Sequence, residues 1–284
     1  MNSSLSGPRG QGKSRTRGKL AFQGGKPSKP GVLVISHGSP DPHWVTLVDE
    51  AVAAAAAGLP ADLPLAASFL ETVEGRLIQD GIDRLESQGV TDLIVIPLFV
   101  SSGSTHIDEI EYALGVKNTL EKETDMERLR ISARVFFGDP IDDDPLVAEM
   151  IWDKVKDLSR EPEREVLLLV GHGSIHDGFL QRWERGISSL AARTGALSGL
   201  ARADYALLNP DSVRRKVSYW AGEQGYDVII APLFLSAGYF TKTVIPSRLA
   251  GLPFRYSGEA LLPHPLLARW MSGQILNIME TLSE

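Results

Sequence analysis

The chain has 284 residues, of which 43% are hydrophobic, and its formal net charge is −7. This length fits a globular protein with one large or two medium domains, and its short apolar runs suit buried strands rather than membrane spans. Because the chain contains no cysteine, it has no disulfide, zinc-thiolate site, cysteine-ligated iron–sulfur cluster or cysteine nucleophile. Any bound metal must therefore be held by histidine, carboxylate or solvent.

The charge is unevenly distributed. Residues 1–30 contain seven Lys or Arg and no acid, which leaves a formal charge of about −14 on the remainder. The composition of residues 1–30 is typical of a disordered basic tail, and it lacks the apolar segment of a secretory signal. We leave this tail out of the fold as an extension or cloning remnant, with contact to nucleic acid as the alternative.

From residue 31, short β-rich runs alternate with helical stretches. Strands are predicted at 31–36, 63–70, 93–100 and 131–137, and helices at 44–59, 75–88, 107–114 and 145–158. Strands separated by helices of this length imply right-handed βαβ crossovers and a mostly parallel sheet.

A charged stretch at 157–165 leads to a second series in the same order. It has strands at 166–171, 201–208 and 228–235, helices at 179–194 and up to about residue 224, and a last helix from Pro265. VLVISHGSPDPHW (32–44) corresponds to LLLVGHGSIHDGF (167–179), and LIVIPLFVSSG (93–103) to VIIAPLFLSAG (228–238), both at an offset of 135 residues.

This repeat predicts an α/β protein of two tandem flavodoxin-like domains, at 31–158 and 159–284. Each domain is expected to be a small parallel sheet of about four strands with helices on both faces. The cleft between the two domains is the natural ligand site.

Three polar residues of the first half lie at or just beyond predicted strand ends: His37, Glu71 and His106. Ligands of open parallel sheets bind beyond the carboxyl ends of the strands, so these side chains are expected to meet at one mouth. Two neutral imidazoles and a carboxylate suit a divalent metal ion with open coordination positions.

Each residue also has a simpler interpretation. His37 would be a turn residue bonded to nearby backbone, His106 a solvated residue at a helix start, and Glu71 a first-turn carboxylate favoured by the helix dipole. The second copy argues against these interpretations, because it keeps the strands and glycines but has Ala206 or Asn209 for Glu71, and Thr241 for His106. Only His37 keeps an identical partner, His172. We therefore place the working site in the first half and regard the second site as degenerate.

Neighbouring residues give weaker signals. Gly38 and Ser39 fit a tight turn whose backbone N–H groups suit an anion, and Ser101 to Thr105 form a polar, flexible loop for ligand closure or merely for solvent. Glu109, on the same helical face as His106, is a candidate hydrogen-bond partner of that histidine or a proton acceptor, although our preferred interpretation is a solvated helix carboxylate. The remaining histidines, His43, His176 and His264, are interpreted as structural.

Because phosphate-binding glycine motifs, a GxSxG elbow and a Rossmann fingerprint are missing, the sequence disfavours ATP use, serine hydrolysis and dinucleotide binding.

Taken together, these motifs resemble the sirohydrochlorin chelatase family, the ATP-independent class II chelatases of the two-domain cobaltochelatase type. The resemblance covers residues 31–284 and lies in a strand ending in HGS, a central FLE and a PLFLSAG-type loop before a second histidine. Members commonly place that histidine two residues after the loop glycine, whereas His106 lies three after Gly103. In the second copy, Phe240 occupies the family position of this histidine.

The resemblance implies a cytoplasmic lyase that inserts Co²⁺, Fe²⁺ or Ni²⁺ into sirohydrochlorin in cobalamin or siroheme biosynthesis. His37, Glu71 and His106 would be the catalytic metal ligands, with the metal as a substrate at the domain interface. Ser39, Ser101, Ser104, Lys242 and Arg248 are candidate contacts for this polycarboxylated tetrapyrrole, although solvated surface charge is the simpler interpretation of the last two. No nucleic acid or membrane partner is expected.

Two rival hypotheses remain at this stage. A non-catalytic metallochaperone or tetrapyrrole-binding protein of the same fold would bind without metallating. A two-domain sugar- or phosphate-binding protein would lose nothing when His37 or His106 is changed to Ala.

Overall fold

The fold is that of a computed structural model, which describes residues 28–283. Most of the predicted tail lies outside the described residues, but its last three belong to the fold. Ser28 Oγ donates a hydrogen bond to Asp92 Oδ2 at 2.8 Å, and Pro30 begins the first strand. The ordered chain therefore starts at least three residues earlier than the sequence indicated.

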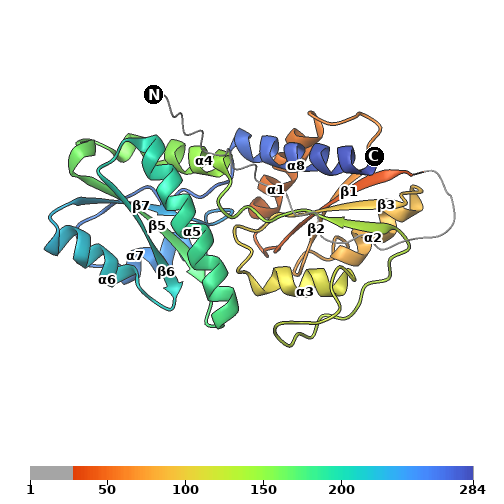
Figure 1. The fold of residues 1–284 in the computed structure, drawn as a ribbon, viewed down its shortest axis with the longest axis horizontal. Coiled ribbons are helices and arrows are strands. Elements are labelled where there is room, and N and C mark those ends of the chain that lie inside the picture. Colours follow the sequence, from red (N-terminus) through yellow and green to blue (C-terminus); the bar gives the residue numbers. More distant parts are fainter. Residues whose placement is uncertain (1–27, 284) are drawn as a thin grey trace, which may run out of the picture.

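The first half is a four-stranded parallel sheet in the order β2-β1-β3-β4 (Figure 1). The strands are β1 (Pro30–Ser36), β2 (Leu65–Phe69), β3 (Asp92–Pro97) and β4 (Arg134–Phe137). The connecting helices are α1 (Pro42–Ala56), α2 (Ile78–Ser87) and α3 (Thr105–Ala113), and α4 (Pro145–Val155) follows β4. Asp41 caps α1 by accepting a hydrogen bond from the His43 amide, and Pro42 lies in the first turn.

The second half repeats this arrangement as a parallel sheet in the order β6-β5-β7-β8. The strands are β5 (Glu165–Gly173), β6 (Arg202–Asn209), β7 (Asp227–Pro232) and β8 (Arg255–Tyr256). The helices are α5 (Asp177–Ser198), α6 (Val213–Val217), α7 (Ile245–Arg248) and α8 (Pro265–Ser283), with π-helical segments at Ser218–Glu223 and Phe240–Val244. Three short elements were not predicted: the 3₁₀ turn Pro162–Arg164, expected as a charged link, β8, whose two residues form no apolar run, and the helical segment Phe240–Arg248, expected as a loop.

The predicted fold class is confirmed, because both halves are parallel sheets with helices on both faces. Alternate residues of each strand point to opposite faces. Leu33 and Ile35 of β1 pack with α2 and α3, whereas Val32 and Val34 belong to a core cluster that also contains Leu167 and Leu169 of β5. One hydrophobic core thus runs between the two sheets and joins the halves.

The helices that end the two halves are exchanged. α4, encoded in the first half, packs against α5 and β7, and α8, encoded in the second half, packs against α1 and β3 (Figure 1). Side-chain bonds fix the exchange: Gln274 of α8 bonds both the amide and the carbonyl of Asp139, which follows β4, and Lys154 of α4 donates to the Pro263 carbonyl. The division at residue 158 stays a prediction, because α4, the helix before it, packs in the second half.

None of the helices within residues 28–283 has both the length and the apolar composition to cross a membrane.

Candidate functional site

A cavity of about 690 Å³ lies between the two halves, beyond the carboxyl ends of β1, β3, β5 and β7. Parallel sheets bind ligands at this edge, so the predicted position of the site is where the structure has a cavity. The first half contributes His37, Gly38, Ser39, Trp44, Leu98, Phe99, Val100, Lys122 and residues 103–106. The second half contributes residues 172–176, Trp183, Asn209, residues 234–236 and residues 238–241.

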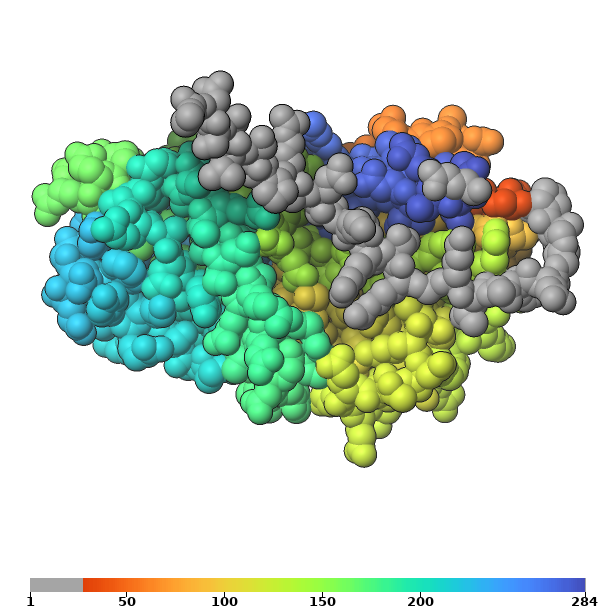
Figure 2. All heavy atoms as spheres, viewed as in Figure 1, coloured from red at the N-terminus to blue at the C-terminus, as the bar shows by residue number. Residues whose placement is uncertain are grey.

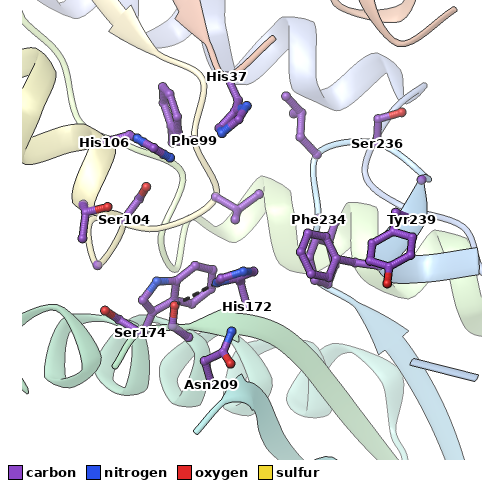
Figure 3. Close-up of a pocket in the computed structure, with 18 of the residues that line it drawn as sticks. His37, Phe99, Ser104, His106, His172, Ser174, Asn209, Phe234, Ser236 and Tyr239 are labelled. Atoms are coloured by element: carbon purple, nitrogen blue, oxygen red, sulfur yellow. Dashed lines mark hydrogen bonds between the residues drawn. The ribbon is translucent and has the colours of Figure 1, made fainter. Parts of the chain in front are cut away.

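His37 and His106 come together on the first-half wall of this cavity (Figure 3). Their ring centroids are 4.9 Å apart and the rings meet edge to face at 75°. His37 follows the last residue of β1, and His106 is the second residue of α3, which follows β3, so two strands that are neighbours in the sheet position them. Their side chains are 44% and 34% exposed, which leaves both rings open to a ligand.

In both rings the Nδ1 atom faces an acceptor. His37 Nδ1 lies 3.2 Å from the Gly38 carbonyl oxygen and 3.6 Å from Glu71 Oε1, and His106 Nδ1 lies 2.9 Å from Glu109 Oε2. A carbonyl can only accept, so we assign the His37 proton to Nδ1, and the same tautomer satisfies the bond of His106 to the carboxylate. Each Nε2 then carries a free lone pair, the form in which a neutral histidine binds a metal.

The two carboxylates differ in their surroundings. Glu109 is only 14% exposed and contacts His106 directly, so our interpretation of it as a solvated helix residue is wrong. Its spacing of three residues on the same helical face was the available signal. Glu71 is 57% exposed and does not line the cavity.

The described residues contain no set of three or more His, Asp or Glu side chains arranged to hold a metal ion. His37, Glu71 and His106 are neighbours, but Glu71 lies at the Nδ1 side of His37 rather than beside both Nε2 atoms. In this arrangement Glu71 orients an imidazole, as carboxylates behind metal-bound histidines do. Direct ligation by Glu71 requires its side chain to rotate.

The loop that leads to His106 is packed against the second half, in contrast to the flexible loop that we predicted. Ser101 is 2% exposed, and its Oγ accepts from the Gly103 amide. The Ser102 amide donates to Asp142 Oδ1 at 2.8 Å, and the Ser102 carbonyl accepts from Arg182 Nε of α5 at 3.1 Å. Burial raises the pKa of Asp142, although the bond from Ser102 opposes that rise. Figure 2 shows the green surface of α5 in contact with the yellow surface around α3.

Gly103 leaves no room for a side chain between the loop and α5. A Cβ at this position would lie 2.5 Å from the Phe179 carbonyl oxygen and 2.5 Å from Trp183 Cδ1, both in α5. A glycine is therefore required for the loop to approach the helix this closely. The contact couples the position of His106 to the second half.

The second half contains a matching set of positions with different side chains. Gly38 and Gly173 both have positive φ, and a Cβ there would collide with the carbonyl oxygens of Glu71 and Asn209 respectively, which makes Asn209 the counterpart of Glu71. His172 and Phe240 meet edge to face at 5.1 Å, as His37 and His106 do, so Phe240 rather than Thr241 is the counterpart of His106. Two of the three predicted metal ligands are thus replaced, by Asn209 and Phe240, while His172 and the backbone frame are kept.

The predicted substrate contacts are only partly assembled. Ser39 and Ser104 line the cavity, whereas Ser101 is buried behind it. Lys242 is exposed outside the cavity. Arg248 is also outside it and is held by the Leu208 carbonyl and the Asp211 carboxylate. Among the described lining residues, Lys122 is the one with a cationic side chain, and the sequence had not singled it out.

A sequence model of the CbiX family matches residues 31–158 and 166–277, and so covers both halves. The chain belongs to the CbiX family. The predicted relationship to sirohydrochlorin chelatases is confirmed, since this CbiX-family chain matches two proteins of that kind. It is 28% identical over 133 residues to a sirohydrochlorin cobaltochelatase of Methanococcoides burtonii, covering 46% of the chain and 97% of that protein. It is 30% identical over 134 residues to that of Methanothermobacter thermautotrophicus, covering 45% of the chain and 92% of that protein.

Solved structures show the same fold. SirB from Bacillus subtilis with Fe³⁺ superposes on this CbiX-family chain with a TM-score of 0.69 at 20% identity, over 87% of this chain and 94% of that one. SirB from Bacillus subtilis subspecies spizizenii in complex with cobalt gives 0.65 at 18% identity over the same shares. At these identities the likeness establishes the architecture alone.

Proposed function

We propose that this protein inserts a divalent metal ion into sirohydrochlorin or a related tetrapyrrole. Co²⁺ is the leading candidate for the metal, and Fe²⁺ and Ni²⁺ are the alternatives. The observation that carries the proposal is the pair His37 and His106, whose rings lie 4.9 Å apart on the wall of the cavity between the halves. The names of the two curated relatives support both the reaction and cobalt as the metal.

His37 and His106 hold the incoming ion through Nε2, because their Nδ1 atoms are already engaged. The carboxylates of Glu71 and Glu109 orient the two rings, and Glu71 becomes a third ligand after rotation. Open positions on the ion then allow the pyrrole nitrogens to replace solvent.

The cavity has the composition that a flat, polycarboxylated macrocycle needs. Trp44, Phe99, Phe234 and Tyr239 provide aromatic surface for its faces, and the hydroxyls of Ser39 and Ser104 provide donors for its carboxylates. Lys122 supplies the positive charge that we had expected from Lys242 and Arg248.

The test is metallation of free-base sirohydrochlorin by the purified protein under anaerobic conditions, with each metal in turn. The absorbance spectrum of the tetrapyrrole monitors the reaction. Insertion well above the rate without protein supports the proposal. Binding of metal and tetrapyrrole without insertion would instead support the non-catalytic rival. Unchanged behaviour of His37→Ala and His106→Ala would favour the sugar- or phosphate-binding rival.

Several points stay predictions of the sequence. These are a cytoplasmic location and the absence of an ATP requirement, of an iron–sulfur cluster, and of nucleic acid or membrane partners. Omitting ATP from the metallation assay tests the absence of an ATP requirement directly.

A further inference from the structure

The second-half wall of the cavity carries two imidazoles that the metal-holding pair does not use, His172 and His176, of which His172 is the counterpart of His37. His172 is the penultimate residue of β5, is half-buried, and lines the cavity opposite His37 and His106 (Figure 3). Its Nδ1 lies 3.1 Å from the Gly173 carbonyl oxygen. Because that oxygen can only accept, Nδ1 carries the proton and Nε2 keeps a free lone pair.

The neighbours of His172 distinguish it from a metal ligand. Where His37 has a second imidazole beside it, His172 has the apolar ring of Phe240 at 5.1 Å. Where His37 has the carboxylate of Glu71 at 3.6 Å, the corresponding position near His172 is the uncharged Asn209. A single neutral imidazole with neither partner is poorly equipped to hold a divalent ion but remains a base.

The proposed reaction requires such a base. Two pyrrole N–H protons must leave as the metal enters, and an imidazole bound to the metal through Nε2 has no lone pair left to accept one. A proton acceptor on the wall opposite the metal-holding pair meets this requirement without competing for the ion.

We propose that His172 Nε2 accepts a pyrrole proton during metal insertion, an inference that rests on the proposed function. The pyrrole N–H bond breaks, its electron pair stays on the nitrogen and binds the metal ion, and the proton forms an imidazolium at His172. The imidazolium then returns its proton to the solvent through the open cavity, which frees His172 Nε2 to accept the second pyrrole proton in the same way. The second site has thus lost metal binding but kept its base.

His172→Asn tests this role, because asparagine can still donate to the Gly173 carbonyl but offers no basic nitrogen. We expect the affinities of this variant for Co²⁺ and sirohydrochlorin to stay within about twofold of the wild-type values. Its melting temperature should stay within a few degrees of that of the wild type. Single-turnover insertion should fall by about 100-fold or more, the range of general base catalysis. Added imidazole should restore part of the rate in His172→Ala. His172→Gln provides a second variant should the asparagine chain fail to fold.

His43→Asn is the matched control, since His43 is exposed on α1 outside the cavity. This variant should insert metal at the wild-type rate. Wild-type insertion by His172→Asn would overturn the inference while leaving the proposed function intact. A parallel loss of Co²⁺ binding would overturn it too, because His172 would then be a ligand. Failure of the wild-type protein to metallate would overturn the proposed function, and this step with it.

Discussion

At the scale of single residues, Glu109 is the side chain on which His106 most directly depends. It is 14% exposed and its Oε2 lies 2.9 Å from His106 Nδ1, so it fixes both the orientation and the tautomer of that ring. We expect Glu109→Gln to weaken Co²⁺ binding by about 10–100-fold, the usual effect of removing a carboxylate behind a metal-bound histidine. Isothermal titration with Co²⁺ measures this directly.

Glu123→Gln is the control for this prediction, because it removes an exposed carboxylate and the same charge. Equal affinity of the Glu109 variant and the wild type would show that His106 is oriented by other groups.

The site residues that the sequence could predict are those that lie just after a predicted strand. His37 and His106 were assigned from their positions after β1 and β3, and they share a cavity wall. The role of Glu109 does not follow from the sequence, because spacing cannot distinguish a carboxylate turned toward a histidine from one turned toward solvent. Lys122 lies in an irregular segment after α3, where no periodic pattern indicates which residues reach the cavity.

At the scale of elements, the loop before α3 is positioned by α5 from the other half. Gly103→Ala would place a Cβ 2.5 Å from the Phe179 carbonyl oxygen and Trp183 Cδ1, so the loop must move. Overpacking of this kind costs about 1–3 kcal/mol. We expect the loop to carry His106 with it and Co²⁺ affinity to fall by about tenfold, as measured by titration.

Gly238→Ala is the matched control, since this glycine is the counterpart of Gly103 and a Cβ there meets no atom within 4 Å. If both variants bind Co²⁺ equally well, the contact with α5 does not position the loop.

The order of strands and helices could be read from sequence because apolar periodicity is a local property. The packed state of the loop could not, because Ser102 and Gly103 are anchored by Arg182 and Trp183, about 80 residues further along. A run of serine and glycine looks flexible when those partners are not known.

At the scale of the whole molecule, the exchange of α4 and α8 ties the two halves into one structure. Residues such as Leu267, Trp270 and Met271 of α8 are buried in the core next to α1. Burying a side chain of this size contributes about 1.5–3 kcal/mol, so loss of the helix would remove much of a domain's usual stability of about 5–15 kcal/mol.

We therefore expect a chain that ends at residue 263 to lose order in the first half, although the deletion is in the second. Hydrogen exchange should show the amides of β1 and β3 losing protection while those of β5 and β7 stay protected by α4. Loss of protection confined to the second half would contradict the exchange of helices. The exchange itself could not be predicted, because the repeat shows only that each half has a final helix and not which sheet it covers.

The proposed site as a whole depends on one Co²⁺ ion being held by two imidazoles from the first half. X-ray absorption at the cobalt edge of the Co²⁺-loaded protein tests this most directly. We predict two imidazole nitrogens at roughly 2.0–2.2 Å in the wild-type protein and one in either His37→Ala or His106→Ala. A spectrum with only oxygen ligands, or one unchanged by both substitutions, would contradict the account.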